Sequence, residues 1–257
     1  MRRGRQGAAS AAALAALILG VAGLAVSLAG VAIQVLPRQF TAAERQKIMA
    51  WEVGRRWRTL PARSIFPASV RYQAPDTFPD GTPLALSAQR IGIAPQSACA
   101  AAADRPVALI LARYGCQALL RATYVDGTDT YVLTVGVAVL PSRAQAGSVQ
   151  RGLTAPRLTD SRRGAAAVAG VRTAGFGGTS AAGFTNSRRQ LAASVSEGPY
   201  VVMYAVGYTD GRPWVPVTDD SYADAEMTSM AAGVARSVAT VLGAPPRAPR
   251  CPGAPGC

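Results

Sequence analysis

The pattern of apolar and polar positions begins with one long apolar run near the start of the chain. Ala11–Ile33 is 23 residues without a charged side chain, and three arginines precede it. About 20 apolar residues span the roughly 30 Å hydrocarbon core of a bilayer as a helix. We therefore expect a basic cytoplasmic head over residues 1–10 and a transmembrane helix, a signal-anchor, over residues 11–36.

A cleaved signal peptide is the main alternative for this run. The apolar region of a signal peptide is usually about 7–15 residues long and ends at a small-residue cleavage site. The run here is longer, and Ala29–Ala32 offers only a mediocre site. A buried helix of a soluble domain would be unusually long. The length therefore favours an uncleaved anchor.

The flanking charges do not by themselves orient this anchor. Five basic residues follow it within about twenty positions, the range over which the positive-inside rule counts. Long domains, however, are translocated largely regardless of charge. The chain also has four cysteines, and an even number behind an export signal fits disulfides in an oxidising compartment. We expect a single-pass cell-membrane protein with its N-terminus in the cytoplasm and its C-terminal domain outside.

The spacing of the cysteines suggests two local disulfides, Cys99–Cys116 and Cys251–Cys257. Four cysteines allow three pairings, and the sequence does not choose among them. A zinc site is the weaker alternative, because the chain has no Cys-x-x-Cys motif and no histidine.

An amphipathic helix over residues 42–58 is predicted after the anchor. Thr41 and Glu44 have the spacing of a capping box at its start. Met49, Val53 and Trp57 recur at helical spacing, with arginines on the opposite side. Such a helix could lie on the outer membrane surface, but it more often packs its apolar stripe on its own domain.

Two β-hairpins are the clearest local structures of the remaining chain. The first joins strands over residues 118–125 and 130–140 through an Asp126-Gly127 turn, and the second joins 189–196 to 200–208. Residues 130–137 can be aligned with 199–206, which hints at an internal repeat. Two unrelated hairpins of similar composition are the alternative.

The other predicted elements surround these hairpins. Strands are expected over 69–73, 84–93 and 168–173, and residues 175–178 are expected to form a loop. Helices are expected over 98–103, 106–114, 143–153 and 222–242; Pro106 opens the second, Gly115 ends it and Ser142 caps the third. The pattern predicts an α+β domain over residues 38–243. In it, an antiparallel sheet of two β-hairpins carries helices on one face, and a disordered Pro/Gly-rich tail follows over 244–257.

Charge narrows the choice of partners. The formal net charge is +13, which attracts anionic lipids, acidic wall polymers or nucleic acid. The arginines are scattered along the chain, whereas a nucleic-acid binder usually concentrates them on one element with aromatic residues between them. We expect a solvated basic surface and no nucleic-acid partner.

Catalytic chemistry has little support in the sequence. The absence of histidine removes the commonest general base and metal ligand, and there is no Gly-x-Ser-x-Gly elbow or Walker loop. A Ser/Lys dyad would need Lys47, which follows the anchor closely. We therefore expect a protein that is not an enzyme and has no metal, no cofactor and no catalytic residues.

Two features of the sequence are nevertheless candidate functional sites. Asp219, Asp220, Asp224 and Glu226, with Asp210 upstream, could form a calcium site or a hydrolytic carboxylate pair, but acidic residues at a helix N-terminus more simply complement its dipole. Trp214, between two prolines in a predicted loop, is the candidate exposed recognition aromatic.

Three stretches, Ile48–Val53, Arg121–Asp126 and Asp224–Met230, resemble the uncharacterised single-pass membrane proteins common in actinobacteria. The resemblance covers the anchor and most of the domain, and it implies location and architecture but no activity.

These observations lead to two functional hypotheses. The first is a non-enzymatic envelope protein whose outer domain mediates protein–protein interaction, as an accessory to secretion or cell-wall assembly. The alternative is a ligand-sensing or ligand-binding domain for anionic envelope polymers or small molecules.

Overall fold

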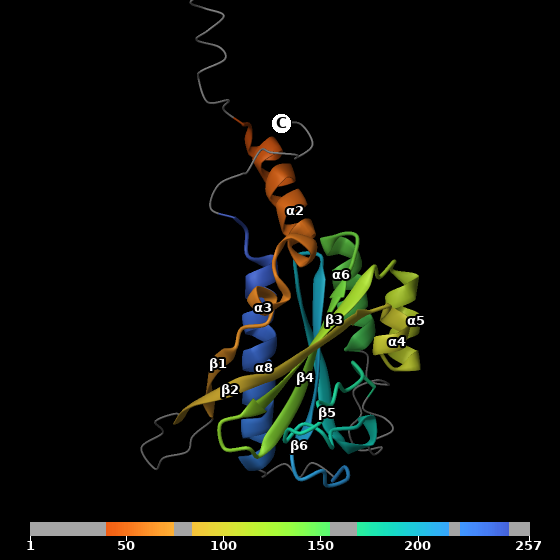
Figure 1. Cartoon of the computed structure of the whole chain (residues 1–257). Helices are drawn as coiled ribbons and strands as arrows, with labels where there is room; N and C mark the ends of the chain where they lie inside the picture. Colours follow the sequence, from red (N-terminus) through yellow and green to blue (C-terminus); the bar gives the residue numbers. More distant parts are fainter. Residues whose placement is uncertain (1–39, 75–83, 155–168, 216–221, 247–257) are drawn as a thin grey trace, which may run out of the picture. The chain divides into compact units, whose positions relative to one another are not determined.

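The computed structural model describes residues 40–74, 84–154, 169–215 and 222–246 (Figure 1). The chain divides into two compact units, Met1–Arg45 and Gln46–Cys257. The expected head and anchor lie outside the described residues, as does nearly all of the expected tail. Within the described part of the chain, no helix combines the length and the apolar character needed to cross a bilayer.

Helix α2 (Ala42–Thr59) begins with the predicted capping box. The Thr41 N–H donates to Glu44 Oε2 at 2.8 Å, and the Glu44 N–H donates to Thr41 Oγ1 at 3.2 Å. Further along the helix, Ile48 and Val53 are buried. The prediction that the apolar stripe packs on the domain is therefore confirmed.

Six antiparallel strands form one sheet in the order β1-β2-β3-β4-β6-β5. The strands are β1 (Ser69–Ala74), β2 (Leu84–Ser97), β3 (Ala118–Asp126), β4 (Tyr131–Val139), β5 (Arg189–Glu197) and β6 (Tyr200–Tyr208). Both predicted hairpins are present, as β3–β4 and β5–β6. β1 and β2 also pair with each other, so the sheet contains more than the two expected hairpins. β2 extends beyond the predicted end because bulges let it continue to pair with β3.

The turn between β3 and β4 is organised by the carboxylate of Asp126. This side chain is 4% exposed and accepts hydrogen bonds from the N–H groups of Thr128, Thr130 and Tyr131 at 2.9, 2.8 and 2.6 Å. Asp129, not Gly127, adopts the left-handed conformation, with φ +59°. The predicted turn over residues 126–129 is thus confirmed, with the four-residue loop shifted by one position to 127–130.

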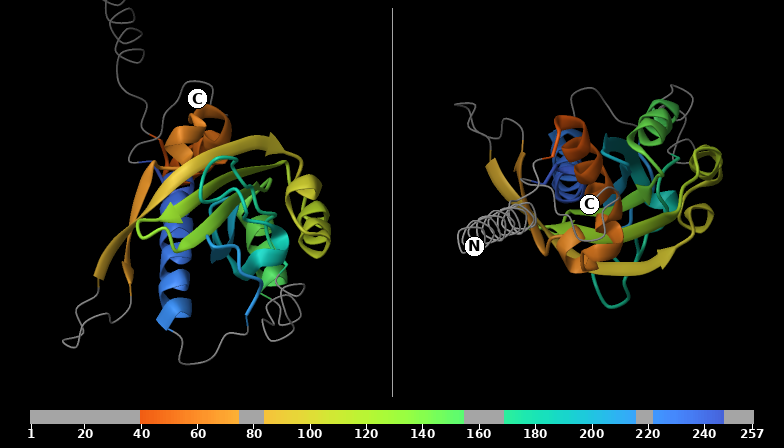
Figure 2. Two further views of the ribbon diagram at one scale, coloured as in Figure 1. Left: turned by 60° about the horizontal axis from the view of Figure 1, so that its bottom comes forward. Right: turned by 90° about the horizontal axis from the view of Figure 1, so that it is seen from above.

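Helices cover both faces of the sheet, so the prediction of helices on one face is wrong. α8 (Tyr222–Gly243) lies on one side, and α4 (Cys99–Ala102), α5 (Arg105–Arg113) and α6 (Arg143–Leu153) lie on the other (Figures 1 and 2). The reason is visible in the central strands: every position of β4 and of β6 is buried. An apolar strand without alternation has two faces to cover.

The aligned segments of the suspected repeat are the neighbouring strands β4 and β6. They pair antiparallel around Val135 and Tyr204, which also correspond in the alignment. The two hairpins are therefore related by an approximate two-fold axis through the sheet. The helices that follow them, α6 and α8, cover opposite faces. The similarity is thus limited to the hairpins.

The predicted Cys99–Cys116 disulfide is present, with 6.4 Å between the Cα atoms. It joins the start of α4 to a residue three positions beyond the end of α5. There the N–H groups of Gly115 and Cys116 donate to the carbonyls of Ala112 and Leu111, at 3.1 and 3.0 Å, and Gly115 has φ +73°. This is a Schellman motif, and it confirms Gly115 as the residue that ends the helix. Cys251 and Cys257 lie outside the described residues.

Residues 169–188 cross the sheet without forming the strand predicted over 168–173. Only one bridge, between Val171 and Ala103, is formed in the described part of this segment, and the 3-10 helix η3 (Asn186–Arg188) precedes β5. Two backbone hydrogen bonds flank the bridge, from the Asp104 N–H to the Gly170 carbonyl at 3.0 Å and from the Arg172 N–H to the Ala102 carbonyl at 2.9 Å, and side chains add to them. Asp104 Oδ2 accepts from the Gly170 N–H at 3.0 Å and lies 2.6 Å from Arg189 Nη1.

An arginine connects α2 to the end of α8. Arg56 Nη1 donates to the carbonyls of Val241, Leu242 and Ala244 at 3.3, 3.0 and 2.5 Å. The last carbonyls of a helix have no partner within the helix and carry its negative dipole end. Arg56 therefore supplies the hydrogen-bond donor that these carbonyls at the C-terminal end of α8 lack within the helix. Between α2 and β1, the short helix α3 (Ala62–Ile65) buries Ile65 in the hydrophobic core between the sheet and α8.

Candidate functional site

Three of the hollows on the described part of the domain bear on function. One is a small pocket between β5 and α5, one is an apolar groove beside α2, and one is a polar groove between β1 and α8. They differ in size and in the chemistry of their walls, and those differences select the candidate site.

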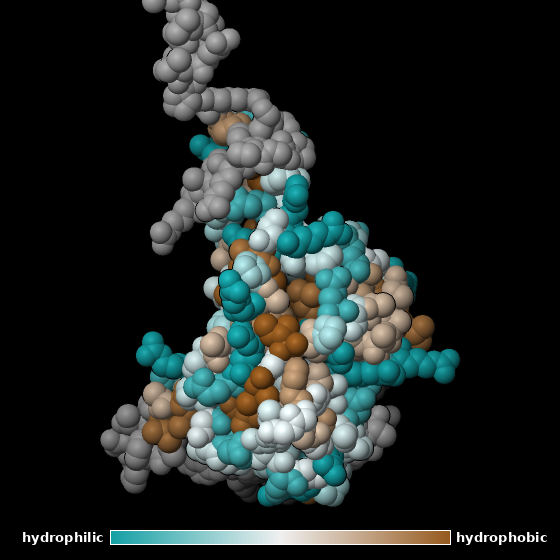
Figure 3. All heavy atoms as spheres, viewed as in Figure 1, coloured by the Kyte–Doolittle hydropathy of each residue, from teal (hydrophilic) through white to brown (hydrophobic). Residues whose placement is uncertain are grey.

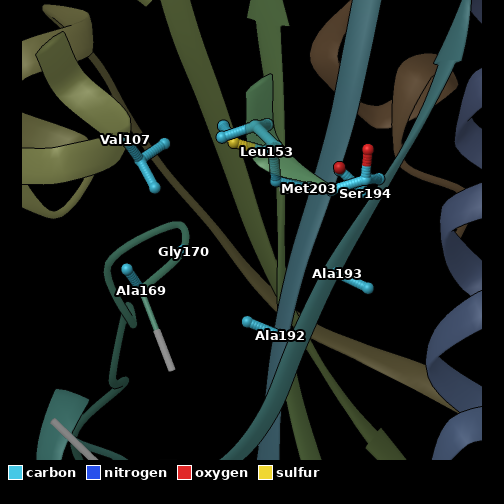
Figure 4. A pocket seen from close by; sticks show the side chains of 9 residues that line it. Val107, Leu153, Ala169, Gly170, Ala192, Ala193, Ser194 and Met203 are labelled. Atoms are coloured by element: carbon cyan, nitrogen blue, oxygen red, sulfur yellow. The ribbon is translucent and has the colours of Figure 1, made fainter. Parts of the chain in front are cut away.

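The small pocket is too small to bind a substrate. Figure 4 shows Val107, Leu153 and Met203 on its walls and Ala192 and Ser194 on β5. Its volume is about 70 Å³. The two grooves are larger by a factor of about seven or more, with volumes of about 520 and 760 Å³.

The apolar groove beside α2 is larger, about 760 Å³. Its walls include Met49, Trp51, Pro141 and the β5–β6 turn at Gly198. Its walls are mainly apolar, and nothing in the described part of the chain indicates what would occupy it.

The third hollow, here named the β1–α8 groove, has polar walls and a volume of about 520 Å³. One wall is five consecutive residues of β1 and the other is a stripe of α8. The lining residues are Ser69, Val70, Arg71, Tyr72, Gln73, Ser229, Gly233, Arg236, Ser237 and Thr240.

β1 lies at one edge of the sheet formed by the described strands, and the backbone groups of every second residue face away from β2. The Arg90 N–H donates to the Ala68 carbonyl at 2.8 Å, in the same register that pairs β1 with β2. Hydrogen-bonded residues alternate along an antiparallel pair. The N–H and C=O groups of Ser69, Arg71 and Gln73 therefore point to the free edge.

The neighbouring strand supports this assignment. The Ser87 carbonyl accepts from the Gly127 N–H at 2.8 Å, toward β3, so odd-numbered residues of β2 face away from β1. Among the described residues, β2 is the only strand that pairs with β1. The strand at the other edge, β5, has a side-chain partner for its backbone: the Ser194 carbonyl accepts a hydrogen bond from Gln150 Nε2 of α6 at 2.8 Å.

Small residues keep the α8 wall close to β1. Ser229, Gly233 and Ser237 recur every four residues and so lie on one face of the helix. A Cβ atom added at Gly233 would lie 3.0 Å from Tyr72 Cβ, so only glycine fits this approach without a shift. The stripe therefore provides hydroxyl groups and a close contact between helix and edge strand.

Two arginines give the groove its charge. Arg71 and Arg236 are exposed on opposite walls, and no acidic residue is among the lining residues. Glu226 lies one turn before Ser229 on the same helix. Burial, and then the nearby Asp126 carboxylate, raise the pKa of Glu226. Burial, followed by Asp126 and Glu226, also raises the pKa of Tyr72 well above its ordinary value.

Trp214, the predicted recognition aromatic, is half-buried instead of fully exposed. Its Nε1 is buried and has no hydrogen-bond partner among the described residues. The buried side chain of Gln190 holds the flanking backbone: its Nε2 donates to the Pro213 carbonyl at 3.1 Å, and its Oε1 accepts from the Val215 N–H at 2.9 Å. Trp214 is not part of the β1–α8 groove.

The acidic residues of the candidate calcium or hydrolytic site are not clustered in the described structure. Asp210 pairs with exposed Arg212 at 2.5 Å, and Glu226 lies near Tyr72. Asp219, Asp220 and the side chain of Asp224 lie outside the described residues. No group of three acidic, cysteine or histidine side chains within the described ranges could hold a metal ion.

Hydrophilic and hydrophobic side chains are intermixed on the face seen in Figure 3. Hydropathy on that face therefore does not single out one patch, and the β1–α8 groove is distinguished by its geometry.

The described residues form an antiparallel α+β domain of six strands, in which no further strand pairs with β1. The chain matches no protein-family model, no curated protein and no solved structure. Sequence reasoning did not single out the groove, although the Ser229, Gly233, Ser237 stripe was a readable signal. Small residues at a spacing of four indicate a helix face that another element approaches closely.

Proposed function

We propose that this chain is a non-enzymatic, membrane-anchored envelope protein whose extracytoplasmic domain binds a protein partner through the β1–α8 groove. A role as an accessory to secretion or cell-wall assembly fits a domain that is held at a membrane and binds without chemistry. Membership of the actinobacterial family that the sequence resembles remains a prediction.

The single observation that carries this proposal is the open edge of β1. An exposed edge strand is a template for pairing with another chain, and proteins commonly block such edges. Here β5 is contacted by Gln150, whereas three residues of β1 direct backbone groups that pair with no other described strand into a walled groove. The absence of histidine from the chain argues in the same direction, since it removes the usual general base.

Binding of an anionic envelope polymer is a second candidate. Arg71 and Arg236 favour it, because guanidinium groups bind carboxylates and phosphates in bidentate fashion. Retention of the domain on an acidic-polymer column should then survive moderate salt, which screens exposed charges over about 10 Å at 0.1 M. Loss of retention at that salt would argue against this candidate.

Site-specific photocrosslinking in intact membranes tests the protein–protein proposal. A benzoylphenylalanine at Gln73, on the groove, should give a discrete adduct that Arg71→Glu/Arg236→Glu abolishes. The same probe at Leu109, which is 64% exposed on α5, is the matched control. Equal adducts at both positions, or none at Gln73, would contradict a partner in the groove.

Labelling with a membrane-impermeant maleimide tests the location. Arg151→Cys places a thiol on the exposed end of α6, and Gln6→Cys places one in the expected cytoplasmic head. On intact cells we expect the first to react and the second to react only after lysis. The reverse pattern would place the domain in the cytoplasm.

A further inference from the structure

We infer that the occupant of the β1–α8 groove is an extended, acidic segment of the partner protein, which adds to the sheet as a seventh strand beside β1. This inference rests on the proposed function and specifies the chemistry of the partner. It follows from three features of the groove: the outward backbone groups of β1, the second wall formed by α8, and the positive charge of two arginines.

The backbone groups point to a strand. Ser69, Arg71 and Gln73 present N–H and C=O groups at every second residue along the free edge, and an added strand would pair with them in the same way as β2 pairs on the other side. A sugar or phosphate polymer has no matching series of alternating donors and acceptors.

The second wall makes this edge a bounded site. The α8 stripe supplies Ser229, Ser237 and Thr240 hydroxyls beside the edge. Gly233 lies against Tyr72, so the floor of the groove is closed by the contact between helix and strand. An added strand would thus pair with β1 along one edge and face polar groups of α8.

The positive charge of the groove favours an added strand with acidic side chains. Arg71 and Arg236 would face it from two sides, so acidic side chains in its centre are favoured. Glu226, one turn before the groove, disfavours acidic residues at that end. Pairing of β1 with β1 of a second copy is disfavoured, because centring on Arg71 would place two arginines opposite each other.

A fluorescence-anisotropy titration of the full-length protein in nanodiscs tests the inference. The probe is a labelled hexapeptide of alternating glutamate and valine. Three comparison probes are the same peptide N-methylated at alternate residues, a lysine–valine peptide and polyphosphate. We expect only the unmodified acidic peptide to bind well, because N-methylation removes backbone donors and leaves the charge unchanged.

Two variants separate pairing from charge. Gln73→Pro removes one outward N–H from the edge while both arginines remain, and proline is tolerated where its missing N–H faces away from the ladder. Arg71→Glu/Arg236→Glu should weaken binding on the order of tenfold, as loss of two exposed charge pairs predicts. Arg105→Glu/Arg151→Glu has the same charge change on α5 and α6 and should leave binding unaltered.

The outcomes are distinguishable. Equal binding of the N-methylated peptide or of polyphosphate would overturn strand addition and leave an anion site. No binding of the acidic peptide would overturn the inference, while a crosslink at Gln73 would still support a partner of another kind. If Gln73→Pro unfolds the domain, as circular dichroism would show, the N-methylated probe still decides the question on the unmodified protein.

Discussion

Arg189 Nη1 lies 2.6 Å from Asp104 Oδ2 and joins the start of β5 to the residue that precedes α5. The Arg189 side chain is 6% exposed and also donates to the Val171 carbonyl at 3.2 Å. Removing Arg189 deprives the largely buried Asp104 carboxylate of its closest charged partner and leaves it with the Gly170 N–H and the more distant Arg172.

Arg189→Met is therefore expected to lower the free energy of unfolding by about 3–5 kcal/mol, as measured by urea denaturation. Arg212→Met is the control, since the Arg212–Asp210 pair is half-exposed on both sides and its loss should leave the urea midpoint nearly unchanged. Equal effects of the two substitutions would show that the Arg189 contact does not stabilise the fold.

Reduction of the Cys99–Cys116 disulfide should destabilise the domain. The bridge closes a loop with a sequence separation of 17, for which chain entropy predicts about 3 kcal/mol. We expect a lower melting temperature in dithiothreitol, and a Cys99→Ala/Cys116→Ala variant that melts near the reduced protein. A remaining response of that variant to reductant would reveal a contribution from Cys251 and Cys257.

Glu226 predicts a pH dependence of stability. Because its pKa in the folded state is raised, the folded protein binds more protons than the unfolded chain between the ordinary glutamate value and the raised one. The stability that this group contributes is thus present below the ordinary value, about 4.3, and is lost as the pH rises through the folded-state pKa.

Glu226→Gln removes this titration. We expect a higher urea midpoint than for the parent protein at neutral pH, and a difference that shrinks toward zero below about pH 4. A difference of the same size at both pH values would mean that packing, and not ionisation, causes it.

Two helical glycines provide a matched test of the β1–α8 contact. No heavy atom lies within 4 Å of a Cβ added at Gly54, so Gly54→Ala should stabilise α2 by about 0.5–1 kcal/mol. At Gly233 the added Cβ lies 3.0 Å from Tyr72 Cβ, so steric crowding should offset the gain in helix propensity. Urea midpoints check both, and equal stabilisation would mean that α8 and β1 lie further apart than described.

Local signals in the sequence predicted local structure well. The Thr41–Glu44 box, the Ser142 cap, which accepts from the Gln145 N–H at 3.4 Å, and the Gly115 helix end depend on residues within a few positions of one another. The hairpins and the Cys99–Cys116 bridge are likewise formed between segments close in sequence.

The errors concern contacts between distant segments. The segment around Val171 has strand-like composition, but its neighbours Ala103, Asp104 and Arg189 determine its conformation. The second covered face of the sheet could have been inferred from β4, where apolar residues occupy both alternating sets of positions. The open edge of β1 depends on strand order, which periodicity alone does not specify.

The contact between Arg56 and the last carbonyls of α8 has a mechanical consequence. Arg56 lies on the first helix of the domain, and α8 is its last. The same stretch of α2 is also held to strand β6, because the Tyr200 hydroxyl donates to the Val53 carbonyl at 2.6 Å. A pull on the chain ahead of α2 would therefore load strand β6 and the C-terminal end of α8 together, and α8 forms one wall of the β1–α8 groove.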